Sequence, residues 1–288
     1  MNYFGVLLCL ALLTGCQRPA ATPHYELGNA YSVRGVWFYP GENFTFDDTG
    51  LAAVYGAGHA PLTSDGEVFD PSIVMAGHPT LQLPAVARLT NLENGRSILV
   101  RLNDRGTGNP GRLVDVTRRT AALLGMPDAG GTRVRLQVLA DDSHAAADGL
   151  PGHPQIAMTA APRASVVATD LAPLAGVGAE PNKVRPVTAP VATVDAPVAI
   201  ARPPETVTQG MPNPGRLWVR LDAFEEYQYA VAQRARMNDL GASIEPVFEG
   251  RVRRFRVQIG PLDTVPQAER ALNDALARGI PDAHIVVD

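Results

Sequence analysis

Short apolar runs bounded by turn residues dominate the first half of the chain. Each run has the length and composition of a β-strand, and Asn94-Gly95 between the first two is typical of a β-hairpin. Thr117 as an N-cap and Gly125 as a stop signal predict one helix at 117–124. The predicted strands cover residues 85–91, 97–102, 112–116 and 132–139. We therefore expect a small, mostly β domain at residues 31–140, folded as a closed barrel.

Residues 213–288 show alternating strand and helix patterns. The order βαββαβ is ferredoxin-like, with both helices packed on one face of an antiparallel sheet. The predicted elements are strand 217–223, helix 225–240, strand 243–248, strand 253–259, helix 265–278 and strand 283–287. The chain is accordingly predicted to join a mainly β domain to a second domain of α+β class.

Residues 141–212, between the two domains, are rich in Ala, Pro, Val and Thr and poor in aromatic side chains. Such a stretch cannot bury enough apolar surface to offset the entropy lost on ordering. Its prolines favour extended conformations. We interpret it as a disordered Pro/Ala-rich linker.

The N-terminus carries an uninterrupted apolar run from Phe4 to Leu13. A run of this length is too short to span a bilayer but suits the core of a signal peptide. Leu13 to Cys16 resembles a bacterial lipobox, which implies a signal peptide at 1–15, lipid on Cys16 and a tether at 16–30. Gln17, in place of Asp, implies sorting to the outer membrane. The alternative is a short buried helix with one free cysteine.

Composition narrows the class of function. A net charge of −4 and a pI near 5.9 give no basic field, so nucleic acid is not an expected partner. The chain has no Gly-rich phosphate loop, no nucleophile-elbow motif and no spacing typical of zinc ligands; His59 and His78 lack it. We expect neither a metal nor another cofactor.

Five polar residues of the first domain lie at predicted strand ends or in loops. They are Glu67, Asp70, His78, Asp104 and Arg105, and Asp104 directly follows an apolar strand. Two carboxylates with a histidine suit acid–base chemistry on a glycosidic bond. The alternatives are a turn-forming role for Asp104 and a structural role for His78, while Asp115 is expected to cap the following helix.

These residues and their surroundings resemble the rare lipoprotein A family of septal lytic transglycosylases. The resemblance covers nearly all of the first domain and implies a six-stranded double-psi β-barrel. The second domain resembles a SPOR domain through Arg216 to Phe224 and Phe255 to Pro261. In the barrel the matching stretches are Ala53 to Gly56, Thr63 to Asp70, Ala76 to Pro84, Val86 to Gly106, Leu113 to Asp115 and Ala121 to Gly125.

A lytic transglycosylase cleaves the β-1,4 bond between N-acetylmuramic acid and N-acetylglucosamine without water. One carboxylic acid protonates the leaving oxygen and then removes the proton of the C6 hydroxyl that closes a 1,6-anhydro ring; a raised pKa suits both steps. The resemblance implies that Asp104 is this catalytic group, with Glu67 as competitor. It gives His78 and Arg105 positioning or charge-stabilising roles. Tyr55 and Asp70 are expected to bind substrate.

Three positions depart from the family pattern: Val54 replaces an aromatic residue, Gly58 to Pro61 replaces a longer loop, and Thr107 replaces a proline. The expected activity is endolytic cleavage of peptide-stripped glycan during septal wall processing and daughter-cell separation. Two alternatives are an inactive septal glycan-binding scaffold and an expansin-like wall-loosening protein.

The predicted SPOR sheet offers a second binding surface. Alternation along two strands separates the core positions from an open face. An aromatic ring with guanidinium groups suits sugars and the free lactyl carboxylates of denuded glycan, while the alternative is a solvated face. The residues assigned to this face are Trp218, Arg220, Arg254, Arg256 and Gln258. We thus expect an outer-membrane lipoprotein that faces the periplasm at the septum, binds denuded peptidoglycan and contacts division-site proteins.

Overall fold

The computed structural model describes residues 20–154 and 200–288. The predicted signal peptide, Cys16 and most of the predicted linker lie outside these residues. Within the described ranges, none of the helices combines the length and the apolar character needed to cross a bilayer.

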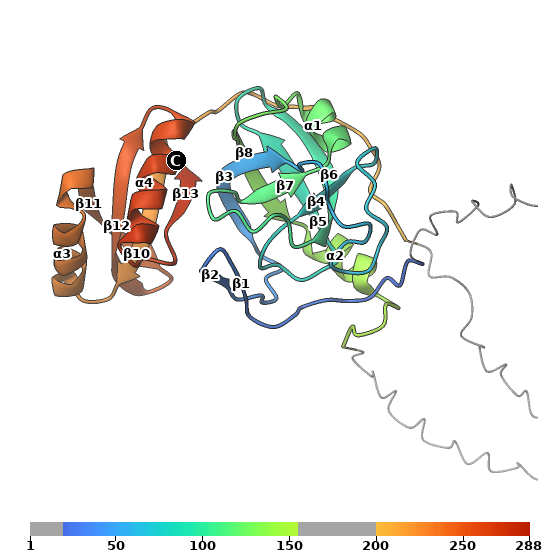
Figure 1. The fold of residues 1–288 in the computed structure, drawn as a ribbon, viewed down its shortest axis with the longest axis horizontal. Helices are drawn as coiled ribbons and strands as arrows, with labels where there is room; N and C mark the ends of the chain where they lie inside the picture. Colours follow the sequence, from blue (N-terminus) through green and yellow to red (C-terminus); the bar gives the residue numbers. More distant parts are fainter. Residues whose placement is uncertain (1–19, 155–199) are drawn as a thin grey trace, which may run out of the picture. The chain divides into compact units, whose positions relative to one another are not determined.

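Six strands of the first domain close into a barrel (Figure 1). Neighbours around the barrel follow the order β4-β7-β3-β8-β5-β6, and a parallel pairing of β4 with β6 completes the circle. The β3–β7 pair is also parallel, and the other four pairs are antiparallel. The strands are β3 (Asp47–Val54), β4 (Met75–Gly77), β5 (Ala85–Asn91), β6 (Arg96–Asp104), β7 (Val114–Val116) and β8 (Thr132–Val138). The predicted six-stranded double-psi barrel is confirmed.

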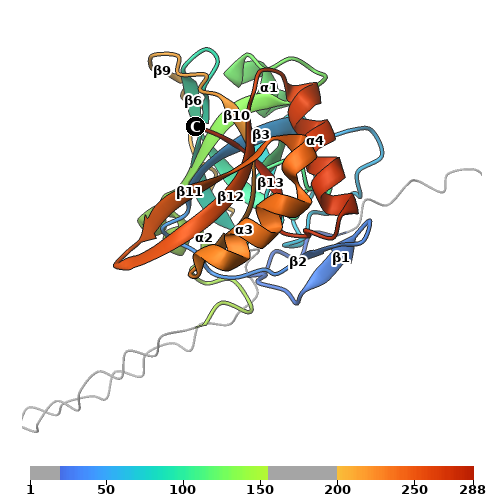
Figure 2. The same ribbon diagram turned by 90° about the vertical axis from the view of Figure 1, so that its left-hand side faces the viewer.

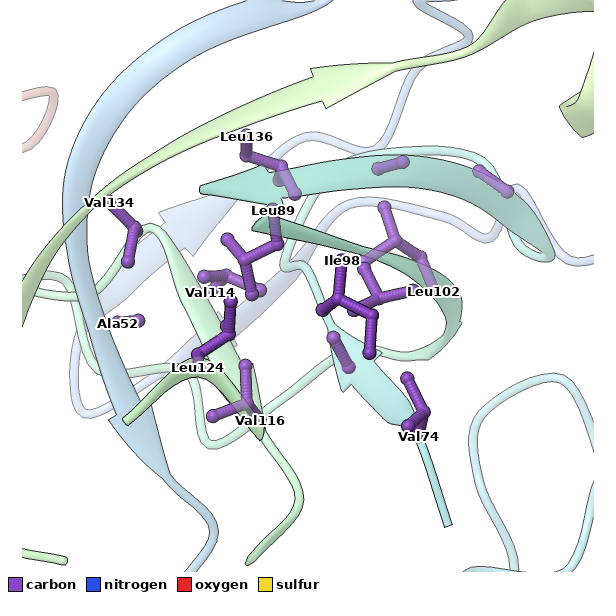
Figure 3. Close-up of a cluster of buried hydrophobic side chains, with 14 of the residues drawn as sticks. Ala52, Val74, Leu89, Ile98, Leu102, Val114, Val116, Leu124, Val134 and Leu136 are labelled. Carbon is purple, nitrogen blue, oxygen red and sulfur yellow. The ribbon is translucent and has the colours of Figure 1, made fainter. Parts of the chain in front are cut away.

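Aliphatic side chains from all six strands fill the barrel (Figure 3). Ala52, Leu89, Leu102, Val116 and Leu136 lie there with no more than traces of exposed surface. β6 contributes Ile98, Val100 and Leu102 at alternate positions, as expected for a strand with one face in the core. This packing fixes the direction in which β6 ends.

Helix α1 (Arg118–Leu124) has the predicted ends. Thr117 is its N-cap and accepts a hydrogen bond from the Thr120 N–H, and Gly125 ends it in the left-handed conformation, with φ of 65°. The predicted hairpin is also present, because β5 and β6 are antiparallel neighbours on either side of Asn94-Gly95. A second, shorter hairpin pairs β1 (Tyr31–Val33) with β2 (Val36–Phe38).

Segments expected to be tether or linker are ordered where they adjoin the barrel. Tyr25 packs with Ala147 and Leu150 in a small apolar cluster. Glu26 forms an isolated bridge with Leu83 of the barrel core, so part of the predicted tether lies against the barrel. Helix α2 (Ala140–Ala147) lies at the start of the predicted linker, and β9 (Thr208–Gln209) near its end pairs with β6. Burial of the ring of Tyr25 and pairing with the edge of β6 provide the stabilisation that composition did not predict.

The C-terminal domain has the predicted βαββαβ order. Its sheet is antiparallel with strand order β11-β12-β10-β13, and both helices pack against it (Figure 2). The elements are β10 (Leu217–Phe224), α3 (Tyr227–Arg236), a 3₁₀ turn (Asn238–Leu240), β11 (Ala242–Glu249), β12 (Val252–Leu262), α4 (Val265–Ala277) and β13 (His284–Val287). Leu217, Val219, Val257 and Ile259 face its core.

Thr117 generates a prediction about barrel stability. Its hydroxyl caps α1 and donates to the Ile73 carbonyl at 2.6 Å, in a buried site. Thr117→Ala removes the cap and leaves buried polar groups without partners, so we expect the free energy of barrel unfolding to fall by about 2–3 kcal/mol. Thr117→Ser keeps the hydroxyl and is expected to lose less than about 1 kcal/mol. Hydrogen exchange of peptides from β6 measures both, and equal protection in the two variants would contradict the assignment.

Candidate active site

Asp104 is the last residue of β6, where this strand lies beside β4. In the register of the two strands Gly77 of β4 is opposite Asp104, and on its other side Gly77 is opposite Asp115 of β7. A Cβ at position 77 would lie 2.0 Å from the Tyr55 hydroxyl and 2.7 Å from the Gly106 nitrogen. The absence of a side chain at Gly77 therefore leaves the space in which Tyr55 reaches Asp104.

Five hydrogen bonds hold the Asp104 carboxylate. Oδ1 accepts from the Ser64 N–H at 3.0 Å and from the Ser64 hydroxyl at 2.9 Å. Oδ2 accepts from the Tyr55 hydroxyl at 2.8 Å and from the Gly106 N–H at 3.0 Å, and lies 3.1 Å from Nε2 of His59. Donors from three separate segments thus converge on one carboxylate, as expected of a functional group rather than of a simple turn.

The charge state of Asp104 differs from the expectation. Burial raises the pKa of Asp104, but the hydrogen bonds from His59 and Tyr55, the charge of His59 and the Gly106 N–H outweigh burial and hold that pKa below its ordinary value. The expected raised pKa is therefore wrong, because the sequence does not reveal how many donors surround the carboxylate. In the free protein Asp104 is a carboxylate at neutral pH, which suits a base and not an acid.

Glu67 lies in a buried polar cluster beneath the site. Its side chain is 2% exposed; Oε1 accepts from Nε of Arg101 at 2.7 Å and Oε2 accepts from Nδ2 of Asn103 at 3.0 Å. Removing Arg101 would leave the buried charge of Glu67 unpaired, at a cost of about 3–5 kcal/mol. The geometry thus gives Glu67 contacts that position the end of β6, and its competing acid–base role stays a prediction.

Asp65 belongs to the same cluster and is fully buried. Its Oδ1 accepts from the Thr63 hydroxyl at 2.7 Å and from the Glu67 N–H at 3.2 Å, while its Oδ2 has no hydrogen-bond partner among the described residues. Burial, assisted by the negative charge of Glu67, raises the pKa of Asp65 to about 8. Asp65 is therefore a protonated carboxyl at neutral pH.

His78 is fully buried and neutral. Its Nδ1 accepts from the backbone N–H groups of Thr80 at 3.2 Å and Leu81 at 3.1 Å, which places the ring proton on Nε2. Burial, with the nearby charge of Arg105, lowers the pKa of His78 to about 3. A positioning role fits this geometry, whereas a charge-stabilising role does not.

Arg105 and Asp70 serve the surrounding backbone. The Arg105 guanidinium donates to the carbonyls of Leu81, Glu26 and Leu27, the last at 2.7 Å, so it holds the N-terminal segment on the barrel. Asp70 accepts from the N–H and the hydroxyl of Ser72 in a turn, at 2.8 Å and 2.6 Å. These contacts position loops beside the site, and the expected substrate-binding roles of both residues stay predictions.

Thr107 explains one departure from the family pattern. Its N–H and its hydroxyl donate to Oδ2 of Asp115 at 2.6 Å and 2.8 Å, which pins the loop that follows Asp104. A proline at this position would have no N–H to donate. Burial raises the pKa of Asp115, and the two Thr107 donors act in the opposite direction. The expected helix-capping role of Asp115 is wrong, because Thr117 caps that helix.

His59 is the functional candidate that sequence reasoning missed. Its ring stacks on Phe69 with centroids 3.8 Å apart and meets the edge of Tyr55 at 5.0 Å. The three aromatic rings border a pocket of about 210 Å³. Its lining comprises Tyr55, Gly56, Ala57, Gly58, His59, Phe69, Pro71 and Arg118. Aromatic faces with a guanidinium group suit a sugar ring that carries a carboxylate.

The five residues predicted to form a binding face on the SPOR sheet differ in exposure and in contacts. Trp218 and Arg220 alternate with core residues on β10, and Trp218 packs over Gly260. Arg256 has intermediate exposure, whereas Gln258 is buried. Arg254 is paired with Glu249 at 3.0 Å and with Glu225 at 3.3 Å. Trp218 and Arg256 therefore fit the predicted binding role better than Arg254 and Gln258.

Comparisons with known proteins agree with this geometry. The family described as lytic transglycolase matches residues 47–136, and the SPOR domain matches residues 213–286. The endolytic peptidoglycan transglycosylase RlpA of Pseudomonas aeruginosa strain UCBPP-PA14 is 30% identical over 84% of this chain and 71% of its own length. The RlpA of Rickettsia bellii is 29% identical over 48% of this chain and 75% of its own length. The RlpA of Yersinia pestis is 35% identical over 46% of this chain and 39% of its own length.

The protonated state of Asp65 predicts how barrel stability depends on pH. The pKa of Asp65 in the folded protein is raised above its ordinary value near 4. The contribution of Asp65 to the stability of the barrel is therefore complete below about pH 4 and is lost as the pH rises through about 8. Asp65→Asn keeps the shape without the charge. As the pH rises from 5 to 8, we expect the free energy of unfolding of the variant to increase by about 2–4 kcal/mol relative to that of the wild type.

Urea-dependent oxidation of the buried Met75 by hydrogen peroxide reads out unfolding of the barrel, since Met75 is 2% exposed. Asp128→Asn, at an exposed position, is the matched control and is expected to follow the wild type at each pH. A difference between Asp65→Asn and wild type that stays constant with pH would count against a protonated Asp65.

Proposed function

Because the chain belongs to the RlpA family of lytic transglycosylases, we propose that it cleaves the glycan strands of peptidoglycan internally and forms 1,6-anhydro ends. The proposed substrate is peptide-stripped glycan, and the proposed setting is processing of the septal wall during daughter-cell separation. SPOR and transglycosylase domains on one chain support this combination of binding and cleavage.

The observation that carries the proposal is the environment of Asp104. A carboxylate with five hydrogen bonds, 7% side-chain exposure and a neighbouring aromatic pocket is arranged for proton transfer at a sugar. The departures from the family pattern do not remove this arrangement, because Thr107 and His59 contribute contacts of their own.

The C-terminal domain supports the choice of denuded glycan. Removal of stem peptides frees a lactyl carboxylate on each muramic acid, and the Arg256 guanidinium and Trp218 ring offer charge and stacking for such a sugar. We further propose that lipid on Cys16 anchors the protein to the outer membrane, from which it faces the periplasm and meets division-site proteins. The lipobox-like sequence from Leu13 to Cys16 supports this part.

Digestion of amidase-treated sacculi by the full chain in detergent tests the proposal. We expect soluble oligosaccharides with 1,6-anhydro ends, identified by mass spectrometry. Asp104→Asn removes the proton-accepting charge and is expected to lower the rate of release by at least about 100-fold, because positioned acid–base groups contribute that much or more. Asp128→Asn, on an exposed loop of the same barrel, is expected to retain wild-type activity.

Other results would favour other functions. Binding of the wild type to denuded sacculi without release of any product would indicate a glycan-binding scaffold. A fall in the stiffness of the sacculi without release would indicate an expansin-like loosening protein. Products that lack the anhydro ring would indicate hydrolysis.

A further inference from the structure

Both ring nitrogens of His59 face oxygen atoms. Nδ1 lies 2.7 Å from the carbonyl oxygen of Ala60, and Nε2 lies 3.1 Å from Oδ2 of Asp104. A carbonyl only accepts hydrogen bonds, and an ionised carboxylate only accepts them as well. A neutral imidazole has one N–H and could satisfy one of these contacts. The geometry therefore requires one more proton than neutral His59 and ionised Asp104 carry together.

That additional proton belongs on Nε2 in the free protein. The Tyr55 hydroxyl and the Gly106 N–H already donate to Oδ2 of Asp104, at 2.8 Å and 3.0 Å. These donors favour the ionised carboxylate, so His59 carries both ring protons. The result is an imidazolium–carboxylate pair in direct contact at 3.1 Å.

The histidine is also the more accessible member of the pair. The side chain of His59 is 16% exposed against 7% for Asp104, and His59 lines the pocket beside Phe69 and Arg118. Stacking on Phe69 with centroids 3.8 Å apart fixes the plane of the ring. A glycan in this pocket would meet the imidazolium edge before the buried carboxylate.

Formation of an anhydro ring needs proton donor and proton acceptor on the same side of the sugar. The departing O4 and the incoming O6 both occupy the β face of C1, so the two proton transfers take place next to each other. An inverting hydrolase instead separates its two carboxyl groups by about 6.5–9.5 Å to admit water. A donor and an acceptor in contact can therefore serve both proton transfers of the anhydro-forming reaction.

We propose that His59 is a catalytic acid that works together with Asp104 as the base, an inference that rests on the proposed transglycosylase function. The Nε2 proton passes to O4 as the C1–O4 bond breaks, which leaves His59 neutral. Oδ2 of Asp104 loses the hydrogen bond from Nε2 at that moment and gains a free lone pair. It takes the O6 proton as the C1–O6 bond forms.

The pair then resets without solvent. The proton on Oδ2 returns to Nε2 across the same contact, so the net change is the transfer of one proton from O6 to O4. No water, metal or redox partner enters the balance. The two-residue pair removes the need for a single carboxyl with a raised pKa.

Titratable side chains face His59 from three elements of the part of the chain that the structure describes. Asp104 approaches from β6, Tyr55 from the end of β3, and Arg118 from the start of α1 across the pocket. Loss of the Asp104 charge at acidic pH removes the base.

The test compares full-length His59→Gln, His59→Ala and wild type in detergent on amidase-treated sacculi, with release of 1,6-anhydro products as the readout. Gln can still donate a hydrogen bond to Asp104 but has no proton to transfer. We expect His59→Gln to lose at least about 100-fold in rate. Added imidazole is expected to restore part of the activity of His59→Ala.

His144→Gln is the matched control, because His144 also stacks on an aromatic ring, Phe44, with centroids 4.0 Å apart but lies on α2. It is expected to match the wild type. Activity of His59→Gln within about fivefold of the wild type, or loss of activity in His59→Ala that imidazole does not restore, would overturn the inference. A wild-type protein that releases no anhydro product would instead refute the proposed function itself.

Discussion

The parallel pairing between β4 and β6 is the constraint on which the rest of the barrel depends. The other strand pairs form a curved sheet, and this one joins its edges. Closure places the end of β6 between β5 and β4, so Asp104 can leave the strand only beside Gly77. The apolar interior made by Ile98, Val100 and Leu102 then fixes the rotation of β6, and with it the direction of the carboxylate. Position and orientation of the acidic group are thus consequences of barrel geometry.

A buried charge pair supports the same strand end from below. Arg101 and Glu67 are each 2% exposed, and their contact at 2.7 Å is made where water cannot screen it. Asn103, two residues further along β6, binds the second oxygen of Glu67. The loop that contains Glu67 also contains Ser64, whose N–H and hydroxyl hold Asp104. One loop therefore serves both the buried pair and the Asp104 carboxylate.

The sequence predicted the elements whose patterns are local. The β5–β6 hairpin, the Thr117 cap and the βαββαβ order each depend on neighbouring residues and agree with the structure. Strand β3 was not predicted because its first four residues, Asp47 to Gly50, are typical of turns, and β4 has only three residues. The location of Asp104 was predictable from the strand before it. Its charge state was not, because the donors include the backbone N–H groups of Ser64 and Gly106, whose convergence depends on tertiary structure.

Gly77 has a consequence for protein engineering. A graft of this chemistry onto another barrel of the same topology would usually transfer the side chains that touch the carboxylate. Here the position opposite the carboxylate must also lack a Cβ, because that atom would come within 2.0 Å of the Tyr55 hydroxyl. A scaffold with alanine at the position of Gly77 could carry every donor and acceptor in its sequence, but its Cβ would keep the Tyr55 hydroxyl away from the carboxylate. The minimal transferable unit therefore includes an empty volume as well as the functional groups around it.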